Sequence, residues 1–237
     1  GARVYDVFFV EWNYFSMHLL DIFKVWQGGL AIHGAIIAGI ITLYVFAKRI
    51  NPLNPPYQGD KEKSPLDKGG EGYLNFWLLA SIMVPGLALA QAIGRWGNYF
   101  NQELFGGPTD LPWGIPISIM NRPIEHISSV YFHPAFLYES IGSLIVFMIL
   151  IGFHILMIRN KIPPTPFVKG GINRYVLCVM CYAIMYSLLR FFTESIRIDE
   201  TPEIFGLRLP QIVSLSVIFC ALIFSIFELK KIKTKID

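Results

Sequence analysis

Four polar side chains lie within nine residues at the end of a long uncharged stretch of the sequence. Arg95 and Glu103 are ionisable, and Asn98 and Asn101 lie between them. A charged side chain inside a bilayer costs roughly 2.5 to 3.5 kcal/mol on insertion scales, so such residues usually face a protein interior or a polar cavity. A lone arginine at a helix end could instead extend to the lipid headgroups. A cluster of this kind favours a functional site that contains an inward-facing cation.

A second polar cluster lies near the end of another apolar run. Tyr186, Arg190, Glu194 and Arg197 are separated by four, four and three residues, which places them on one face of a helix. An ion pair between Arg190 and Glu194 that holds helices together would explain part of this pattern. Two cations beside one carboxylate nevertheless leave positive charge available. The cluster therefore predicts a site for an anion, and guanidinium groups suit phosphate oxygens in particular.

Two histidines are candidates for a proton acceptor. His33 lies early in an apolar span among glycines, where it could accept a proton near neutral pH or simply hydrogen-bond a neighbouring backbone. His133 precedes Pro134, and Tyr138 and Glu139 follow within two turns. Ordinary helix-start chemistry explains much of that second pattern, so we rank it below the arginine clusters. The sequence does not choose between the two histidines as a base.

The composition places these residues in a membrane protein. The chain has 237 residues, of which 54% are hydrophobic and only 16% are charged, whereas soluble domains carry more charge. The formal net charge of +3 is too small to argue for nucleic acid as a partner. We predict an all-α polytopic membrane protein, formed as a single integral membrane domain over residues 1–237.

Uncharged runs define the predicted helices. The first run is long enough to cross about 30 Å of hydrocarbon at about 1.5 Å per residue. We predict five full transmembrane helices, at residues 27–47, 75–94, 140–158, 175–189 and 209–227. Charges interrupt residues 1–26, and this pattern predicts the remnant of an upstream helix followed by an interfacial segment. We therefore expect the chain to be truncated at its start.

The connections between the spans predict an orientation. Most of the 20 basic residues fall on one side, in residues 48–68, 159–174 and 230–235, and lysine and arginine favour the cytoplasmic side. Residues 50–73 are then a cytoplasmic loop, and the C-terminus is cytoplasmic. Residues 99–133 form a small extracytoplasmic head, where β-branched runs at 115–119 and 127–130 suggest a hairpin. The polar clusters lie toward the outer leaflet.

The sequence predicts neither a cofactor nor a metal. Cys178, Cys181 and Cys220 lie in apolar runs without a second cysteine pair or a neighbouring histidine, so packing is the default interpretation. A glycine-rich nucleotide loop, a Ser-His-Asp set and clustered metal ligands are all missing from the sequence.

The polar clusters together resemble the signature of the bacterial prolipoprotein diacylglyceryl transferases. The matching residues are Gly94-Arg95-x-Gly97-Asn98-x-x-Asn101-x-Glu103-x-x-Gly106. Gln102 stands where the family usually has glycine, and His33-Gly34-Ala35 is similar to a His-Gly-Gly motif of the family. Tyr186, Arg190, Glu194 and Arg197 also match, as does the His-Pro element that begins at His133 and ends in Tyr138-Glu139.

This resemblance implies an enzyme of the bacterial inner membrane. Its reaction is transfer of the sn-1,2-diacylglyceryl group from phosphatidylglycerol to the lipobox cysteine of a prolipoprotein signal peptide, with release of glycerol phosphate. The implied catalytic residues are His33, Arg95, Arg190 and Glu194. The implied phosphatidylglycerol-binding residues are Arg95, Asn98, Glu103, Tyr186, Arg190 and Arg197, with Asn101, Gly106, His133, Tyr138 and Glu139 as secondary candidates.

The residues support specific roles within that reaction, and two other functions compete with it. Arg95 and Arg190 would hold the phosphate while Glu194 and Glu103 orient them, and His33 would take the thiol proton. A transporter could use the same arginines, although it should carry an inverted repeat that we do not see in the sequence. A noncatalytic lipid-headgroup scaffold is the other alternative.

Overall fold

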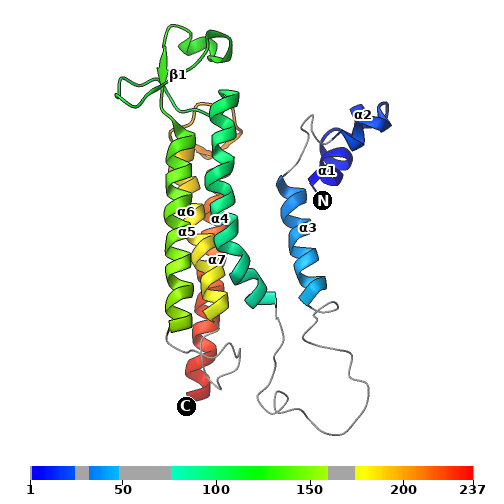
Figure 1. The fold of residues 1–237 in the computed structure, drawn as a ribbon, viewed down its shortest axis with the longest axis vertical. Helices are drawn as coiled ribbons and strands as arrows, with labels where there is room; N and C mark the ends of the chain where they lie inside the picture. The colour runs from blue at the N-terminus through cyan, green and yellow to red at the C-terminus, as the bar shows by residue number, and fades with distance from the viewer. Residues whose placement is uncertain (1, 25–31, 48–75, 160–173, 237) are drawn as a thin grey trace. The chain divides into compact units, whose positions relative to one another are not determined.

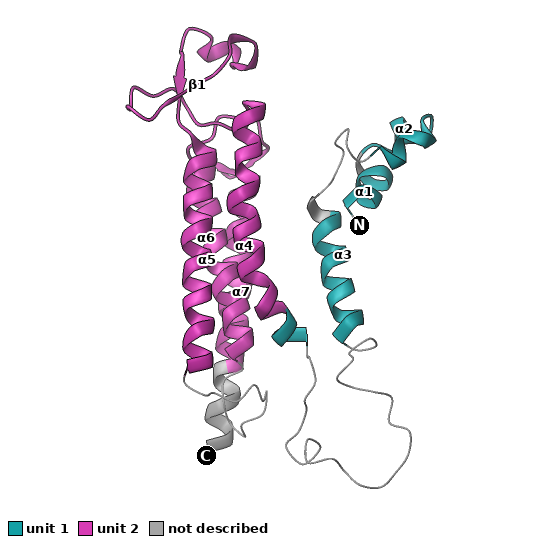
Figure 2. Ribbon diagram, viewed as in Figure 1, with its two compact units in different colours: residues 1–79 teal, residues 80–237 magenta. Residues whose placement is uncertain are grey.

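The computed structural model describes residues 2–24, 32–47, 76–159 and 174–236 (Figure 1). Contacts divide the chain into two compact units, residues 1–79 and residues 80–237 (Figure 2). The organisation as one integral membrane domain stays a prediction.

The first unit consists of short helical segments followed by one longer apolar helix. Its elements are α1 (Ala2–Tyr5), η1 (Asp6–Val10), α2 (Trp12–Phe15), η2 (Leu19–Phe23) and α3 (Ile32–Val45). Arg3 joins the start of this unit to η2, because its Nε donates to the Ile22 carbonyl at 3.0 Å. Its guanidinium also lies 4.7 Å from the centre of the Phe15 ring. Within residues 2–24 the helical segments are each only four or five residues long, and the interpretation as an upstream-helix remnant with an interfacial segment stays a prediction.

Only part of the first predicted span is described. The helix α3 has 14 residues, and residues 27–31 of the predicted span lie outside the described part of the chain. The cytoplasmic loop predicted for residues 50–73 also lies outside it.

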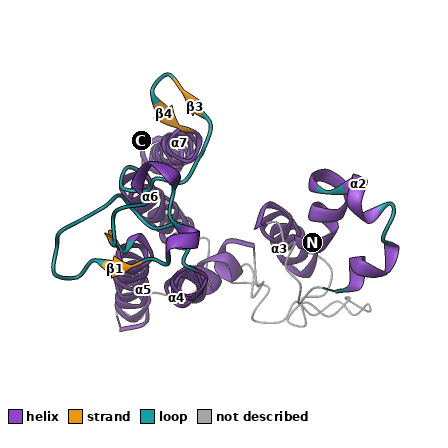
Figure 3. Cartoon of the chain, turned by 90° about the horizontal axis from the view of Figure 1, so that it is seen from above, coloured by secondary structure: helices purple, strands orange, loops and turns teal. Residues whose placement is uncertain are grey.

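The second unit is organised around four long helices, the first of which begins four residues before the unit boundary. They are α4 (Phe76–Asn101), α5 (Ala135–Arg159), α6 (Arg174–Glu194) and α7 (Leu209–Ile236), and they run side by side (Figure 1), as the view from above also shows (Figure 3). Each is long and apolar enough to cross a membrane, α7 through its first 20 residues. The predicted all-α membrane architecture is confirmed, and four of the predicted spans coincide with these helices. The helices are longer than the predicted uncharged runs, since polar residues at their ends are also helical, as in α4, which continues to Asn101.

The long helices bury small and apolar residues against one another and expose large apolar ones. Val84, Ala88, Val146, Leu150 and Cys178 form a buried cluster. The outer faces of α5 and α7 carry exposed isoleucine, leucine and phenylalanine side chains, as expected for helices that face lipid. The exposed cysteines Cys181 and Cys220 depart from the expected packing role, since they lie on such outer faces.

One proline lies inside a long helix. Pro85 of α4 has no N–H to give to the carbonyl of Ser81, four residues earlier. The thiol of Cys178 in α6 lies 4.0 Å from that carbonyl oxygen and donates to it. The neighbouring helix thus supplies a hydrogen bond at the position where the proline removes one.

A small head connects α4 to α5. Its two short strands, β1 (Ile115–Pro116) and β2 (Tyr131–Phe132), pair in antiparallel fashion with Ile115 opposite Phe132, and Phe105, Ile117 and Phe132 form its apolar core. The second strand begins just after the run 127–130 from which we predicted it, and two single helical turns, η6 (Ile119–Asn121) and η7 (Ile124–His126), lie between the strands. A second hairpin, β3 (Glu203–Ile204) and β4 (Leu207–Arg208), connects α6 to α7.

Candidate active site

Glu139 joins the two arginine clusters that the sequence predicts. It lies in the second turn of α5, and only 4% of its side chain is exposed. Its Oε1 lies 2.5 Å from Arg190 Nη1 and accepts a hydrogen bond from Thr193 Oγ1 at 3.0 Å, while its Oε2 pairs with Arg95 Nε. A carboxylate this buried is stable only with such compensation. One glutamate therefore fixes an arginine of α4 beside an arginine of α6.

Glu194 forms a second buried centre at the end of α6. Its side chain is fully buried, and its Oε2 lies 2.7 Å from Arg190 Nη2. Arg197 Nη1 approaches the same oxygen at 3.6 Å, and Arg208 Nη1 lies 3.3 Å from Oε1. Arg190 consequently bridges two carboxylates, Glu139 and Glu194.

These ion pairs form one continuous arrangement, which we call the ion-pair ladder. Its members are Arg95, Glu139, Arg190, Glu194, Arg197 and Arg208. Asp199 also pairs with Arg197 and Arg208, so four arginines face three carboxylates and the ladder keeps a net positive charge. Arg95 and Arg190 keep 22% and 20% of their side chains exposed. The ladder can therefore bind an anion through these two guanidinium groups without giving up its internal pairs.

Neutral polar groups surround Arg95. Asn98 Oδ1 and the Tyr186 hydroxyl each lie 3.5 Å from an Nη atom of Arg95. The Tyr186 ring stacks on Tyr182 with 5.9 Å between ring centres, and the Tyr182 hydroxyl donates to Gln91 Oε1 at 3.1 Å. Asn98 and Tyr186 are thus placed to give further hydrogen bonds to a ligand of Arg95.

Backbone pairing joins the head to the ladder. Gly106 N–H donates to the His133 carbonyl at 2.9 Å, and Gly106 also forms a bridge to Arg197. A Cβ atom at position 106 would lie 2.7 Å from His133 Cβ and 2.7 Å from Ile196 Cγ2. Only glycine fits between these two segments without a shift. Nearby, His133 Nδ1 lies 3.2 Å from the Tyr138 hydroxyl, which accepts a hydrogen bond from Trp113 Nε1 at 2.9 Å.

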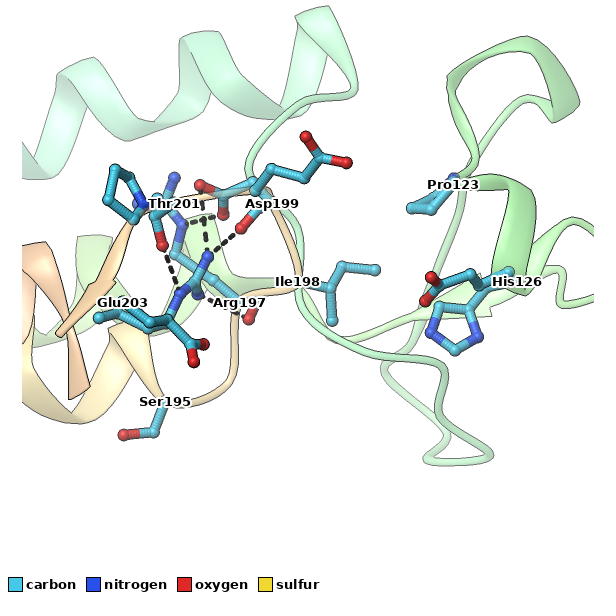
Figure 4. Close-up of a pocket in the computed structure, with 12 residues that line it drawn as sticks. Pro123, His126, Ser195, Arg197, Ile198, Asp199, Thr201 and Glu203 are labelled. Atoms are coloured by element: carbon cyan, nitrogen blue, oxygen red, sulfur yellow. Dashed lines mark hydrogen bonds and ion pairs between the residues drawn. The ribbon is translucent and has the colours of Figure 1, made fainter. Parts of the chain in front are cut away.

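A polar pocket opens at the Arg197 end of the ladder (Figure 4). It has a volume of about 850 Å³ and lies between η7 of the head and the connection from α6 to α7. Pro123 and His126 lie on one side, and Asp199 and Thr201 lie on the other (Figure 4). Arg197 and Asp199 form an ion pair in its wall, with Nε 2.9 Å from Oδ1.

The match to known proteins decides the family. The family model described as prolipoprotein diacylglyceryl transferase matches residues 1–57 and 67–227. The chain belongs to this family. The resemblance found in the sequence is thereby confirmed.

Individual relatives are similar over most of this chain. A phosphatidylglycerol–prolipoprotein diacylglyceryl transferase of Synechocystis sp. is 41% identical over 218 residues, which are 92% of this chain and 65% of the relative. One of the same name from Acaryochloris marina is 40% identical over 90% of this chain and 65% of the relative. One from Finegoldia magna is 38% identical over 98% of this chain and 74% of the relative. The chain thus spans 65% of the length of the first two relatives.

In this member of the family, the structure brings most of the predicted site residues together and changes the partners of two. Glu103 Oε1 accepts hydrogen bonds from Asn98 at 2.9 Å and from Asn101 at 3.1 Å, so its connection to Arg95 runs through Asn98. The carboxylate that contacts Arg95 directly is Glu139, which the sequence ranked lower because helix-start chemistry explained it.

Two further residues differ from this set. His33 lies in α3 of the first unit, and its side chain lies outside the described part of the structure. Its role stays a prediction. Arg208 of the ladder was missed because the sequence shows it only as a single basic residue before the last span. The one available signal was its position immediately before an apolar helix.

Proposed function

We propose that this chain transfers the diacylglyceryl group of phosphatidylglycerol to the lipobox cysteine of a prolipoprotein in the bacterial inner membrane. The observation that carries the proposal is the position of Arg95 and Arg190 on the two oxygens of one buried carboxylate, Glu139. Membership of the family supports the same reaction, as do the names of the relatives.

The reaction is a displacement at an alkyl carbon. The sulfur of the cysteine attacks the glyceryl carbon that carries the phosphate, and a C–S bond forms while the C–O bond to the phosphate breaks. The electron pair of that bond stays on the phosphate oxygen, so glycerol phosphate leaves as an anion. Arg95 and Arg190 stabilise this developing charge, because guanidinium donors act strongly in a site that excludes water.

The two glutamates keep the guanidinium groups in position. Arg190 is held by Glu139 and Glu194 together, at 2.5 Å and 2.7 Å, so little rearrangement is needed when the phosphate binds. Asn98 and Tyr186 add neutral hydrogen bonds beside Arg95, and Glu103 fixes the amides of Asn98 and Asn101. The ladder is thus both the binding site and the charge-stabilising site.

A base must take the proton of the cysteine thiol. An ordinary thiol has a pKa of about 8.5 and is mostly protonated at neutral pH, while the thiolate is the nucleophile. We assign this role to His33. His133 is the alternative, and its contact with the Tyr138 hydroxyl favours a positioning role in the head. If His33 is the base, His33→Gln should remove the acidic limb of the pH profile of kcat, and His133→Gln should leave it in place.

The orientation follows from the basic residues. The Lys-rich connections and the C-terminus lie in the cytoplasm, so the ladder and the head lie toward the outer leaflet. An exported prolipoprotein presents its cysteine near the same leaflet.

The test uses the protein produced from its complete gene, with phosphatidylglycerol labelled in the acyl chains and a lipobox peptide that contains cysteine or serine. We expect label on the cysteine peptide alone, together with released glycerol phosphate. Arg95→Ala should abolish transfer, whereas Arg122→Ala should retain it, because Arg122 donates to head carbonyls of Ile117 and Ile127. Lipid binding without any labelled peptide would replace this function by that of a transporter or a lipid-binding scaffold.

A further inference from the structure

Arg208 makes more hydrogen bonds than its place in a short hairpin requires. It is the residue immediately before α7, and 12% of its side chain is exposed. Its Nη1 donates to the carbonyl oxygens of Glu194 at 2.9 Å and Arg197 at 2.7 Å. Its Nε donates to Thr201 Oγ1 at 2.7 Å, and its Nη2 donates to the Asp199 carbonyl. One guanidinium therefore fixes the whole connection that leaves α6.

This guanidinium also closes the end of α6. Glu194 is the last residue of that helix, and carbonyls in a last helical turn lack partners within the helix. A cation at a helix C-terminus is favourable because the unpaired carbonyls are negative there. Gln211, in the first turn of α7, supports the arrangement by accepting from Arg208 N–H at 3.0 Å and donating to Ser195 Oγ at 2.9 Å. The position of the Glu194 backbone thus depends on the start of α7.

The same guanidinium is one of two partners that lie at different oxygens of the Glu194 carboxylate. Oε1 lies 3.3 Å from Arg208 and Oε2 lies 2.7 Å from Arg190. Because Glu194 is fully buried, loss of the cation at Oε1 leaves a carboxylate oxygen uncompensated in the described ladder, which is costly. Glu194 would then attract the Arg190 guanidinium more strongly. Arg190 is shared with Glu139, so the change would extend along the ladder to Arg95.

We propose that Arg208 is a positioning residue that holds Glu194, and through it Arg190, in the geometry that binds the phosphate. This inference rests on the proposed function. Lysine cannot replace arginine here, because an ammonium offers its donors from a single atom whereas the planar guanidinium offers five donors in a fixed fork.

The experiment compares Arg208→Lys and Arg208→Gln with Arg122→Lys and Arg122→Gln in the complete protein. Arg122 is a matched control, because it also donates to two backbone carbonyls, those of Ile117 at 2.8 Å and Ile127 at 3.0 Å, without a carboxylate of the ladder. We expect Arg208→Lys to lower kcat/KM for phosphatidylglycerol about tenfold, since a guanidinium contact is lost from the ladder. The KM for the peptide should stay unchanged, and the Arg122 variants should stay within about twofold of the original protein.

A double-mutant cycle separates positioning from general loop stability. If Arg208 acts by holding the Glu194 carboxylate, Arg208→Gln should have little additional effect in a Glu194→Gln protein, because no carboxylate remains to be held. If Arg208 only stabilises the connection through its carbonyl contacts, the two losses should multiply. Where Glu194→Gln leaves no measurable transfer, the same cycle is measured on the affinity for phosphatidylglycerol, from thermal shifts in detergent micelles.

The outcomes are distinct. A tenfold loss that disappears in the Glu194→Gln background supports the proposal. Multiplicative losses, or Arg208 variants that behave like those of Arg122, overturn it. If Arg208→Gln does not fold, Arg208→Lys and Thr201→Ala provide the comparison, and Thr201→Ala should show a milder loss of the same kind. If the original protein binds phosphatidylglycerol and never labels the peptide, the transferase function fails, and the cycle on lipid affinity still decides the role of Arg208.

Discussion

Ion pairs of nearly equal length lie in very different surroundings in the two units of this chain. In the first unit, Lys24 Nζ lies 2.6 Å from Asp21 Oδ1, and 40% of the lysine side chain is exposed. In the second unit, Arg190 Nη2 lies 2.7 Å from Glu194 Oε2, and the glutamate is fully buried. Exposed pairs contribute little because solvent screens them. Breaking a buried pair leaves a charge without compensation. Burial, and not distance, decides which pair matters.

The two sets also differ in what they connect. Asp21 and Lys24 are three residues apart, so their contact is local and adds little to the tertiary structure. Glu139 joins Arg95 of α4 to Arg190 of α6. The buried pairs therefore fix the relative position of three helices, and the exposed pair fixes one turn.

The largest predicted effect is that of Glu139→Ala, which breaks the ladder at its centre. The change leaves Arg95 and Arg190 side by side without their carboxylate, and loss of one partner of a buried pair costs about 3 kcal/mol. We expect transfer to fall at least a hundredfold and the melting temperature to drop. Glu125→Ala removes an exposed carboxylate of the head and serves as the control. If the two variants show equal rates of transfer and equal melting temperatures, Glu139 is not part of the site.

A smaller loss is expected from Arg190→Lys, which keeps the charge and removes the bridge. Lysine cannot contact Glu139 and Glu194 in the present geometry, because its donors share one atom. We expect kcat/KM for phosphatidylglycerol to fall by about 30-fold, measured with labelled lipid. A change of less than twofold would favour the scaffold, for which charge alone is sufficient.

The next effect is steric and tests the junction between head and ladder. In Gly106→Ala the new Cβ would lie 2.7 Å from His133 Cβ and Ile196 Cγ2. Overpacking of this kind costs about 1 to 3 kcal/mol, and we expect a lower melting temperature. Gly107→Ala is the matched control, since its Cβ would meet Ile198 Cγ2 at an ordinary 3.7 Å. Equal melting temperatures for the two variants would contradict the tight junction.

The smallest effect is predicted for Asp21→Asn in the first unit. Hydrogen bonds from Lys24 and then from Tyr14 lower the pKa of Asp21, so the stability that this carboxylate contributes is present above its unfolded pKa and is lost as the pH falls through its folded pKa. Because the pair is exposed, the melting temperature at neutral pH should hardly change. The pKa of Tyr14, raised chiefly by its hydrogen bond to Asp21, should fall toward its ordinary value. NMR of labelled tyrosine measures this, and an unchanged Tyr14 titration would refute the contact.

The sequence predicts the helices better than their contacts. Uncharged runs locate α4, α5, α6 and α7 because lipid requires about 20 apolar residues, and the four-residue spacing places Tyr186, Arg190 and Glu194 on one face. The central role of Glu139 could not be derived, because it depends on how α5 packs between two other helices. Arg208 was missed for a similar reason, since its partners lie on a connection whose path no local pattern sets.

The proline inside α4 has a mechanical consequence. Arg95 lies about ten residues beyond Pro85, which is about 15 Å along the helix axis at about 1.5 Å per residue. A rotation of about 5° at the proline would move Arg95 sideways by about 1.3 Å, and misplacement by about 1 Å can reduce a reaction rate a hundredfold. The hydrogen bond from the Cys178 thiol to the Ser81 carbonyl therefore restrains α4 at the point about which the segment that carries Arg95 would rotate.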